Sequence, residues 1–393
     1  MSAAPFRILY IAHYFSDGRR RSLGLTAEYS PGGMNKILPL VALLSRDNEV
    51  TVLSTGYSRR IDFRRIRTHH ETLALGGRRV PVIYPGYLAA RYLSFLEIAL
   101  FCALECLRRK PDFVIFYNFR FETLFPALLA KVFARARIVC QFEDGLHVVF
   151  GRRSLRRYAF GALFALGKKW TDGFTLVNGG LRNEFRGRPA AVIPFILPSG
   201  VDAAPPPSRS DLFRKPVVKV AYSGTLDAER GADVFLEAAD RLRGDPRLRF
   251  FVSGQGPLLS RVLEQAKRGE NLTYAGLLNA KEVEAHLREM DILVNPQKMS
   301  HPFARYSFPS KVMRYILMNK PIVSTAFPDI ANIPAPGLSF YKDDDPAELA
   351  AVLRELSGRE IEVDYRALFE KFSETIARLA LGKLFRRLIS GRE

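Results

Sequence analysis

The chain has 393 residues, a hydrophobic fraction of 48% and a formal net charge of +19 at neutral pH. This length predicts two domains, and the hydrophobic fraction excludes a largely disordered protein. Residues 1–202 carry 30 Lys and Arg against 15 Asp and Glu, whereas the remainder carries 29 against 25. A basic first half favours an anionic partner, either a lipid surface or nucleic acid, and charge alone does not choose between them.

The cysteines, the histidines and the apolar segments limit the class of protein further. Cys102, Cys106 and Cys140 lie in apolar segments without metal-ligand spacing, which is typical of core residues in a reducing compartment. The six His residues show no ligand spacing with Asp, Glu or Cys, so no metal site is predicted. The first residues read as a strand without a basic leader, and the apolar helix candidate 92–107 is too short for a membrane span. We therefore expect a cytoplasmic protein.

The first half alternates short apolar runs with helical patterns. A loop ending at residues 30–35 is expected to precede a helix over 36–44. Alternation of this kind predicts a parallel, doubly wound α/β sheet whose ligands bind at the carboxyl ends of the strands. Strands are predicted at 7–12, 49–54, 112–117, 137–141, 173–177 and 191–196.

A break follows at residues 197–216, which contain three consecutive prolines and read as a linker. The alternation then restarts. The predicted order is a domain over 1–204, a linker over 205–216, a second α/β domain over 217–360, and terminal helices over 361–393. Strands of the second domain are predicted at 217–222, 248–252, 272–274, 292–295, 322–325 and 339–341, with helices between them.

The most informative stretch is 298–325, which begins just after a predicted buried strand and crosses a polar loop to a helix beginning near Pro309. Proline suits a first helical position because its missing N–H would be unpaired there. Ser310, Lys311 and the free N–H groups of the first turn would then form a positive helix end, which is a natural seat for phosphate. The alternative is an ordinary αβ unit with a solvated lysine.

Two further strand ends of the second half carry glycine. Gly224 follows a strand, and Arg230 precedes the next helix, where it could clamp phosphate oxygens or simply lie solvated in a turn. Gly254 and Gly256 end another strand, although this pattern alone is common in βα turns. Together with Lys311 these positions predict a cradle of backbone N–H groups and two cations for a nucleoside diphosphate.

The segments FPSKVMRYILMNKPIVS, YSGTLDAERGADVFLEA and FVSGQGPL resemble the second-domain landmarks of retaining GT-B glycosyltransferases of family 4, or group 1. RILYIAHY, SPGGMNK, EVTVLS and LPSGVD resemble the first-domain landmarks, in the same order. The resemblance implies two Rossmann-like domains facing a cleft that holds a sugar nucleotide, and a final helix that returns to the first domain. It implies retaining transfer from a UDP- or GDP-sugar to a glycan or polyprenyl-linked hydroxyl, without a metal or further cofactor.

The resemblance also implies site residues. Lys311 and Arg230 would stabilise charge on the leaving diphosphate. In the first domain, Glu143 or Asp144 would orient the acceptor hydroxyl or accept its proton, although a helix-capping turn explains the same residues equally well. His147 ranks below both carboxylates. Donor contacts are expected from Gly32, Gly33, Gly224, Thr225, Gly254, Gly256, Gly276, Ser307, Ser310 and Arg314.

Four positions depart from the family pattern. Tyr306 and Arg314 stand where the family commonly has glutamates, and a guanidinium cannot accept the hydrogen bonds that the second glutamate takes from ribose. Thr225 stands where an arginine is frequent, and Asn319 where glycine is usual. Donor binding is therefore altered, weakened or adapted to an additional anionic group, and Arg314 on a rearranged surface is the alternative.

Residues 151–170 combine basic ends with an apolar helical centre and Trp170. This pattern fits a helix lying in the interface of an anionic membrane, at the inner face of the plasma membrane, and equally a core helix with solvated ends. A degenerate GT-B binding protein and a sugar-nucleotide epimerase are alternative functions. Nucleic acid is a poorer partner because the basic residues are not interleaved with stacking aromatics.

Overall fold

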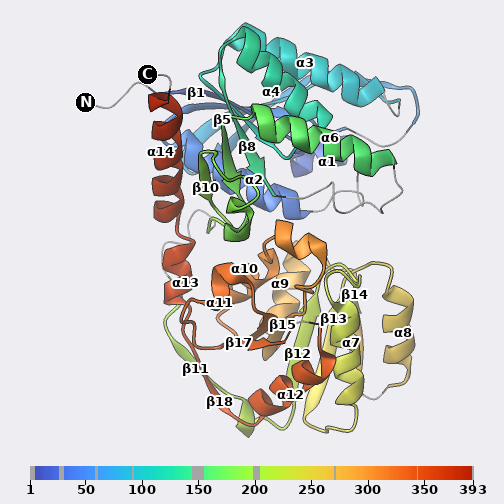
Figure 1. Ribbon diagram of the computed structural model, residues 1–393. Coiled ribbons are helices and arrows are strands. Elements are labelled where there is room, and N and C mark those ends of the chain that lie inside the picture. The colour runs from blue at the N-terminus through green and yellow to red at the C-terminus, as the bar shows by residue number, and fades with distance from the viewer. Residues whose placement is uncertain are drawn as a thin grey trace. The chain divides into compact units, whose positions relative to one another are not determined.

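A computed structural model describes residues 5–25, 31–57, 61–90, 93–143, 155–197, 204–269, 271–342 and 344–391. The chain divides into two compact units, Met1–Val201 with Phe372–Glu393, and Asp202–Lys371. Each unit is an α/β structure with helices around a largely parallel sheet (Figure 1). The two Rossmann-like sheets predicted from the sequence are therefore confirmed.

The sheet of the first unit has eight strands among the described residues, in the order β10-β9-β8-β7-β1-β2-β5-β4. Its neighbours pair in parallel except β4 and β5, which form an antiparallel hairpin. The central strands are buried because helices cover the sheet, which explains their continuous apolar runs. The strands are β1 (Arg7–Ala12), β2 (Glu49–Ser54), β4 (His69–Leu75), β5 (Arg78–Tyr84), β7 (Phe113–Tyr117), β8 (Arg137–Phe142), β9 (Gly173–Leu176) and β10 (Ala190–Val192).

Helices α3 and α4 pack side by side in the first unit (Figure 1). The last helix, α14, packs against β9 and β10, and its Leu384 and Leu388 lie close to Gly173. A short antiparallel pair, β3 (Arg65–Ile66) and β6 (Tyr87–Leu88), precedes α3. The helices are α1 (Asp17–Ser22), α2 (Pro31–Ser45), α3 (Leu93–Arg109), α4 (Phe121–Phe133), α6 (Leu155–Trp170) and α14 (Glu374–Ser390), with the 3-10 turn η1 (Gly179–Arg182).

Two boundaries in the first unit differ from the sequence prediction. Helix α2 begins at Pro31, five residues earlier than expected, so Gly32 and Gly33 lie in its first turn and not in the preceding loop. Proline at that position loses no helical hydrogen bond, which explains the early start. Strand β10 ends at Val192 and does not reach residue 196, because Pro194 has no N–H to continue the ladder.

The sheet of the second unit has six parallel strands among the described residues, in the order β14-β13-β12-β15-β16-β17. Its core combines the apolar faces of β12, β13 and β15 with those of α7 and α12. The strands are β12 (Val218–Ser223), β13 (Leu248–Ser253), β14 (Leu272–Gly276), β15 (Ile292–Asn295), β16 (Ile322–Thr325) and β17 (Leu338–Tyr341). The helices are α7 (Ala232–Arg241), α8 (Leu259–Lys267), α9 (Ala280–Arg288), α10 (Ser310–Leu317), α11 (Pro328–Ala331), α12 (Pro346–Ser357) and α13 (Arg366–Lys371), with the turns η2 (Leu212–Arg214) and η3 (Pro302–Tyr306).

Within the segment expected to be a linker, β11 (Ser208–Asp211) pairs antiparallel with β18 (Glu360–Val363) and belongs to the second unit. Asn319 lies nearby, with a left-handed φ of 53°. Its side-chain amide donates to Pro206 O and Ser208 Oγ, both at 3.1 Å. Asparagine tolerates this backbone conformation better than other non-glycine residues, which explains its presence where the family has glycine.

Candidate functional site

Three neighbouring strands of the second unit end in glycine at the same edge of the sheet. Gly224 N–H donates to Ser253 O, and Gly254 N–H donates to Gly276 O, both at 3.0 Å. The φ angles of Gly224, Gly254 and Gly276 are 155°, 132° and 90°, which side chains rarely adopt. A Cβ on Gly254 would lie 1.8 Å from Gly224 O, so the two backbones approach as closely as glycine allows.

Lys311, the second residue of α10, lies over this glycine edge. A Cβ on Gly224 would be 2.7 Å from Lys311 Cε and 2.9 Å from its Nζ. Lys311 Nζ donates to Tyr222 Oη at 3.1 Å and stands 4.2 Å from the centroid of the Tyr222 ring. Tyr222 Oη donates in turn to Thr225 O at 2.6 Å. The lysine is thereby held against the end of β12 and not free in solvent.

The surroundings of Lys311 disfavour its charge. Burial lowers its pKa from 10.5 to about 7, and the nearby guanidinium groups of Arg230 and Arg314 add to the effect, whereas Asp227 opposes it. A bound dianion would favour the ammonium form, because an opposite charge nearby raises the pKa of a lysine. An anion bound beside Lys311 would therefore offset both its burial and the repulsion from the two arginines.

Arg230 stands at the beginning of α7 and is oriented by one carboxylate. Its backbone N–H donates to Asp227 Oδ1 at 2.8 Å, and its Nη1 donates to Asp227 Oδ2 at 2.5 Å. Gly231, the N-cap of α7, has a φ of 72° and a Cβ there would lie 1.7 Å from Pro296 O. This close approach brings the start of α7 beside the end of β15, so Arg230 and Lys311 share one electrostatic environment.

The other donor positions predicted in the second unit have different exposures. Gly256 packs on Leu226, whose carbonyl oxygen would be 2.5 Å from a Cβ. Thr225 is exposed at the end of the β12 loop, and Ser310 begins α10. Ser307 is buried, and its hydroxyl accepts from Gln297 Nε2 at 2.9 Å, so it braces the loop before α10.

Two of the four departures from the family pattern, Tyr306 and Arg314, differ in their exposure in the structure. Tyr306 is buried in the loop before α10, whereas Arg314 is exposed on α10 one turn after Lys311. Arg314 is close enough to contribute to the lowered pKa of Lys311. It therefore adds a third positive charge to the region of Lys311 and Arg230.

In the first unit, Glu143 follows β8 and is the centre of a buried polar network. Its carboxylate accepts from Gln141 Nε2 at 2.9 Å and from Lys36 Nζ at 2.5 Å, and its N–H donates to Asn118 Oδ1 at 2.7 Å. Tyr10 Oη donates to Gln141 Oε1. The lysine and carboxylate neutralise each other, which allows Glu143 to be buried and Lys36 to be largely covered.

A small pocket opens beside this network, lined by Lys36, Gln141, Glu143, Thr175, Pro194 and Ile196 among others. Thr175 is buried, and its hydroxyl has no hydrogen-bond partner among the described residues. The sequence did not single out Lys36 or Thr175. The only signal for Lys36 is one charge in a largely apolar helix, three residues after the glycine pair.

Two predicted residues of the first unit, Asp144 and His147, lie outside the described residues. Gly32 and Gly33 lie in the first turn of α2, as described above. The described residues contain no cluster of three or more His, Cys, Asp or Glu that could hold a metal ion. In the same part of the chain, every helix falls short of the length and apolar content needed to cross a membrane.

Residues 218–358 match the family described as "Glycosyl transferases group 1". A curated relative is TuaH of Bacillus subtilis (strain 168), named for a glycosyltransferase of teichuronic acid biosynthesis. It is 25% identical over 113 residues, or 28% of each chain. The match thus spans little more than a quarter of the length of that relative.

Solved structures of similar fold match almost the whole chain. Sucrose-phosphate synthase from Thermosynechococcus elongatus is 13% identical with a TM-score of 0.64, and the match covers 98% of this chain and 100% of that one. Anabaena HepE in complex with UDP and glucose is 14% identical with a TM-score of 0.58, over 98% and 96%. The catalytic domain of starch synthase IV from Arabidopsis thaliana, bound to ADP and acarbose, is 14% identical with a TM-score of 0.59, over 98% and 100%. At these identities the likeness shows the GT-B fold alone.

Proposed function

We propose that this protein transfers a sugar from a nucleoside diphosphate donor to a hydroxyl acceptor in cell-envelope glycan synthesis. The premise is that residues 218–358 belong to the group 1 glycosyltransferases and that the chain has the GT-B fold. The observation that carries the proposal is Lys311 held over Gly224, beside Arg230 and three glycine strand ends. Such an arrangement offers cations and backbone N–H groups to a diphosphate.

The proposed mechanism uses these cations on the leaving group. Lys311 and Arg230 would offset the negative charge that develops on the diphosphate as its bond to the sugar breaks. Asp227 would keep the guanidinium of Arg230 in position through its two hydrogen bonds. Transfer proceeds with retention at the anomeric carbon and without a metal, and the departing phosphate takes the acceptor proton.

In the first unit we assign Glu143 to the acceptor. Its carboxylate is held by Lys36 and Gln141 at the wall of a pocket that also contains the unpartnered hydroxyl of Thr175. Groups fixed in this way can orient a sugar hydroxyl with little loss of side-chain entropy. The acceptor is a glycan or a polyprenyl-linked saccharide.

The test is release of nucleotide from UDP- and GDP-sugars in the presence of an extract of membrane lipids. Lys311→Met should abolish release and leave the thermal unfolding transition in place. Lys320→Met is the matched control, because Lys320 is a half-buried lysine of the same unit and its pKa is also lowered, first by burial. Wild-type turnover in Lys311→Met would remove the central assignment.

A catalytically degenerate protein is the second candidate, and Arg314 is the observation that favours it. An exposed guanidinium on α10 replaces the carboxylate that accepts ribose hydroxyls in the family. Donor binding without nucleotide release, across the whole panel of sugar nucleotides and acceptors, would support this candidate. Tighter binding of donors that carry an additional carboxylate would instead assign Arg314 to an anionic group of the donor.

A further inference from the structure

Helix α3 carries a row of leucines that the rest of the described chain leaves exposed. Leu93, Leu96, Leu100 and Leu104 are separated by three or four residues, so they lie along one face of the helix. The opposite face packs into the first unit. Its buried residues are Ser94, Ile98, Ala99, Cys102, Ala103 and Cys106.

The segment before β3 exposes two further large apolar side chains near the start of α3. Ile61 and Phe63 are exposed, and the N–H groups of Asp62 and Phe63 donate to Ala89 O at 3.3 and 3.1 Å. Ala89 lies only four residues before α3, so this segment adjoins the start of the helix. The α3 surface, as it is called below, comprises side chains that are 39% to 69% exposed: Ile61, Phe63, Leu93, Leu96, Leu100 and Leu104.

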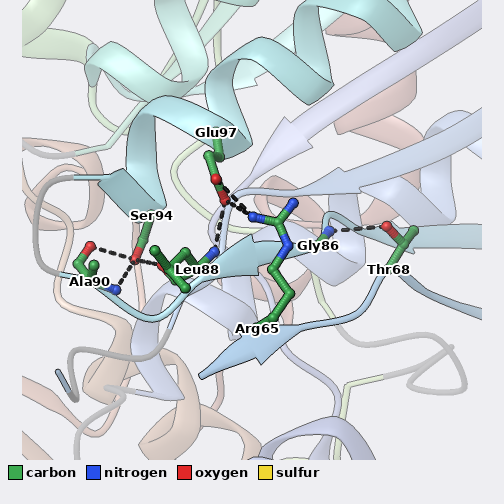
Figure 2. A network of polar contacts seen from close by, with 7 residues as sticks. All are labelled: Arg65, Thr68, Gly86, Leu88, Ala90, Ser94 and Glu97. Carbon is green, nitrogen blue, oxygen red and sulfur yellow. Dashed lines mark hydrogen bonds and ion pairs between the residues drawn. The ribbon is translucent and has the colours of Figure 1, made fainter. Parts of the chain in front are cut away.

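Polar contacts tie the first turns of α3 to the preceding segment, as Figure 2 shows. Glu97 accepts from Leu88 N–H at 2.7 Å and from Arg65 Nη1 at 2.8 Å, which ties α3 to both β3 and β6. Ser94 Oγ bonds with Leu88 O and Ala90 O, each at 2.8 Å. The leucine row is therefore a preformed surface, and no refolding is needed to present it.

Basic side chains accompany the α3 surface at both ends. Residues 61–67 and 93–110 contain six Lys or Arg and three Asp or Glu, a net charge of +3. Arg65, which contacts α3, and Arg108, one turn after Leu104, keep most of their side-chain surface exposed despite their ion pairs. Exposed leucine and phenylalanine with a basic border match the boundary between anionic headgroups and acyl chains.

We propose that the α3 surface docks on a membrane surface rich in anionic lipid. A second copy of this chain fits less well, because two molecules with a net charge of +19 would bring basic borders together. The biological setting, a lipid-linked acceptor, rests on the proposed function. Binding to vesicles can be measured without donor or turnover. The proposed docking surface and the proposed glycosyltransferase activity are therefore tested by separate measurements.

Helix α6, the sequence candidate for this role, fits it less well. The Phe164 ring packs 5.8 Å from both the Phe119 and Phe142 rings, so its apolar centre belongs partly to the core. Among its described residues, α6 exposes three large apolar side chains, Tyr158, Leu166 and Trp170. The α3 surface has six.

The experiment measures co-sedimentation of the full chain with vesicles of phosphatidylcholine, with and without phosphatidylglycerol, over a range of salt. We expect binding only with phosphatidylglycerol, decreasing as salt increases. The double variant Leu100→Gln with Leu104→Gln should bind at least tenfold more weakly. The matched control replaces Leu263 and Leu379, exposed leucines of α8 and α14, by glutamine and should bind as the wild type does.

Three results would overturn the proposal. One is unchanged vesicle binding of the α3 double variant while it remains folded by circular dichroism. Another is loss of binding only when Tyr158 and Trp170 of α6 are replaced by glutamine, which would assign the membrane to α6. The last is a wild-type dimer in sedimentation velocity that becomes monomeric in the α3 double variant, which would assign the surface to a second copy.

Discussion

Raising the pH from 6 to 8 is expected to weaken binding of a sugar nucleotide, because Lys311 loses its proton in that interval. Its pKa in the free protein is lowered to about 7, chiefly by burial. A diphosphate beside the ammonium raises that pKa in the complex. Binding above pH 7 therefore requires uptake of a proton, and affinity is full below the free pKa and declines as the pH rises through it.

The size of the effect follows from the two protonation states. With a pKa of about 7, about one free molecule in eleven carries the ammonium at pH 8, compared with about nine in ten at pH 6. Affinity should therefore fall about tenfold between these pH values, which corresponds to about 1.4 kcal/mol. An esterified diphosphate keeps its charge over this range, so a sugar nucleotide contributes no titration of its own.

The assay is titration calorimetry with UDP-glucose and GDP-mannose in buffers of different ionisation enthalpy. The dependence on buffer counts the protons taken up, close to one at pH 8 and close to zero at pH 6. Lys320→Met should keep the pH dependence, whereas Lys311→Met should bind weakly at every pH. A constant affinity from pH 6 to 8 without proton uptake in the wild type would refute the reasoning.

Further substitutions test the packing by urea unfolding, which measures the free energy of unfolding. Gly254→Ala should lower the free energy of unfolding by about 3 kcal/mol or more and prevent donor binding, because the new Cβ would collide with Gly224 O. A stability near that of the wild type would contradict this. Glu143→Gln should cost about 3 kcal/mol by leaving Lys36 buried without its partner, and adding Lys36→Met should recover much of the loss. Asn319→Ala should cost about 1 kcal/mol more than Asn319→Gly, because only alanine is strained at positive φ; equal losses would exclude backbone strain.

The parallel sheets could be predicted because each central strand is a continuous apolar run between helical patterns. This signal located β1 and β2 as well as β15 and β16. It missed β4 and β5, since β4 at the sheet edge alternates exposed and partly exposed residues, many of them polar, and β5 begins with exposed arginines. Such a pattern resembles a loop when only apolar runs are sought.

The candidate site was predictable where backbone chemistry dictates residue type. Gly224 and Gly254 are needed at positive φ and close approach, and such glycines are visible in a sequence. Lys36 was not predictable as a partner of Glu143, because the pair joins α2 to the end of β8 across 107 positions of chain. Spacing along the sequence contains no information about that contact.

The placement of α14 has a consequence for biosynthesis. The first unit is interrupted by the whole of the second and is completed only by residues 372–393, whose leucines cover Gly173 of β9. A ribosome therefore synthesises all strands that are described in the first sheet before it synthesises α14, the helix that packs on β9 and β10. The second unit, a single unbroken segment, can fold as soon as it has been synthesised, whereas the first unit is complete only after residues 372–393 have followed.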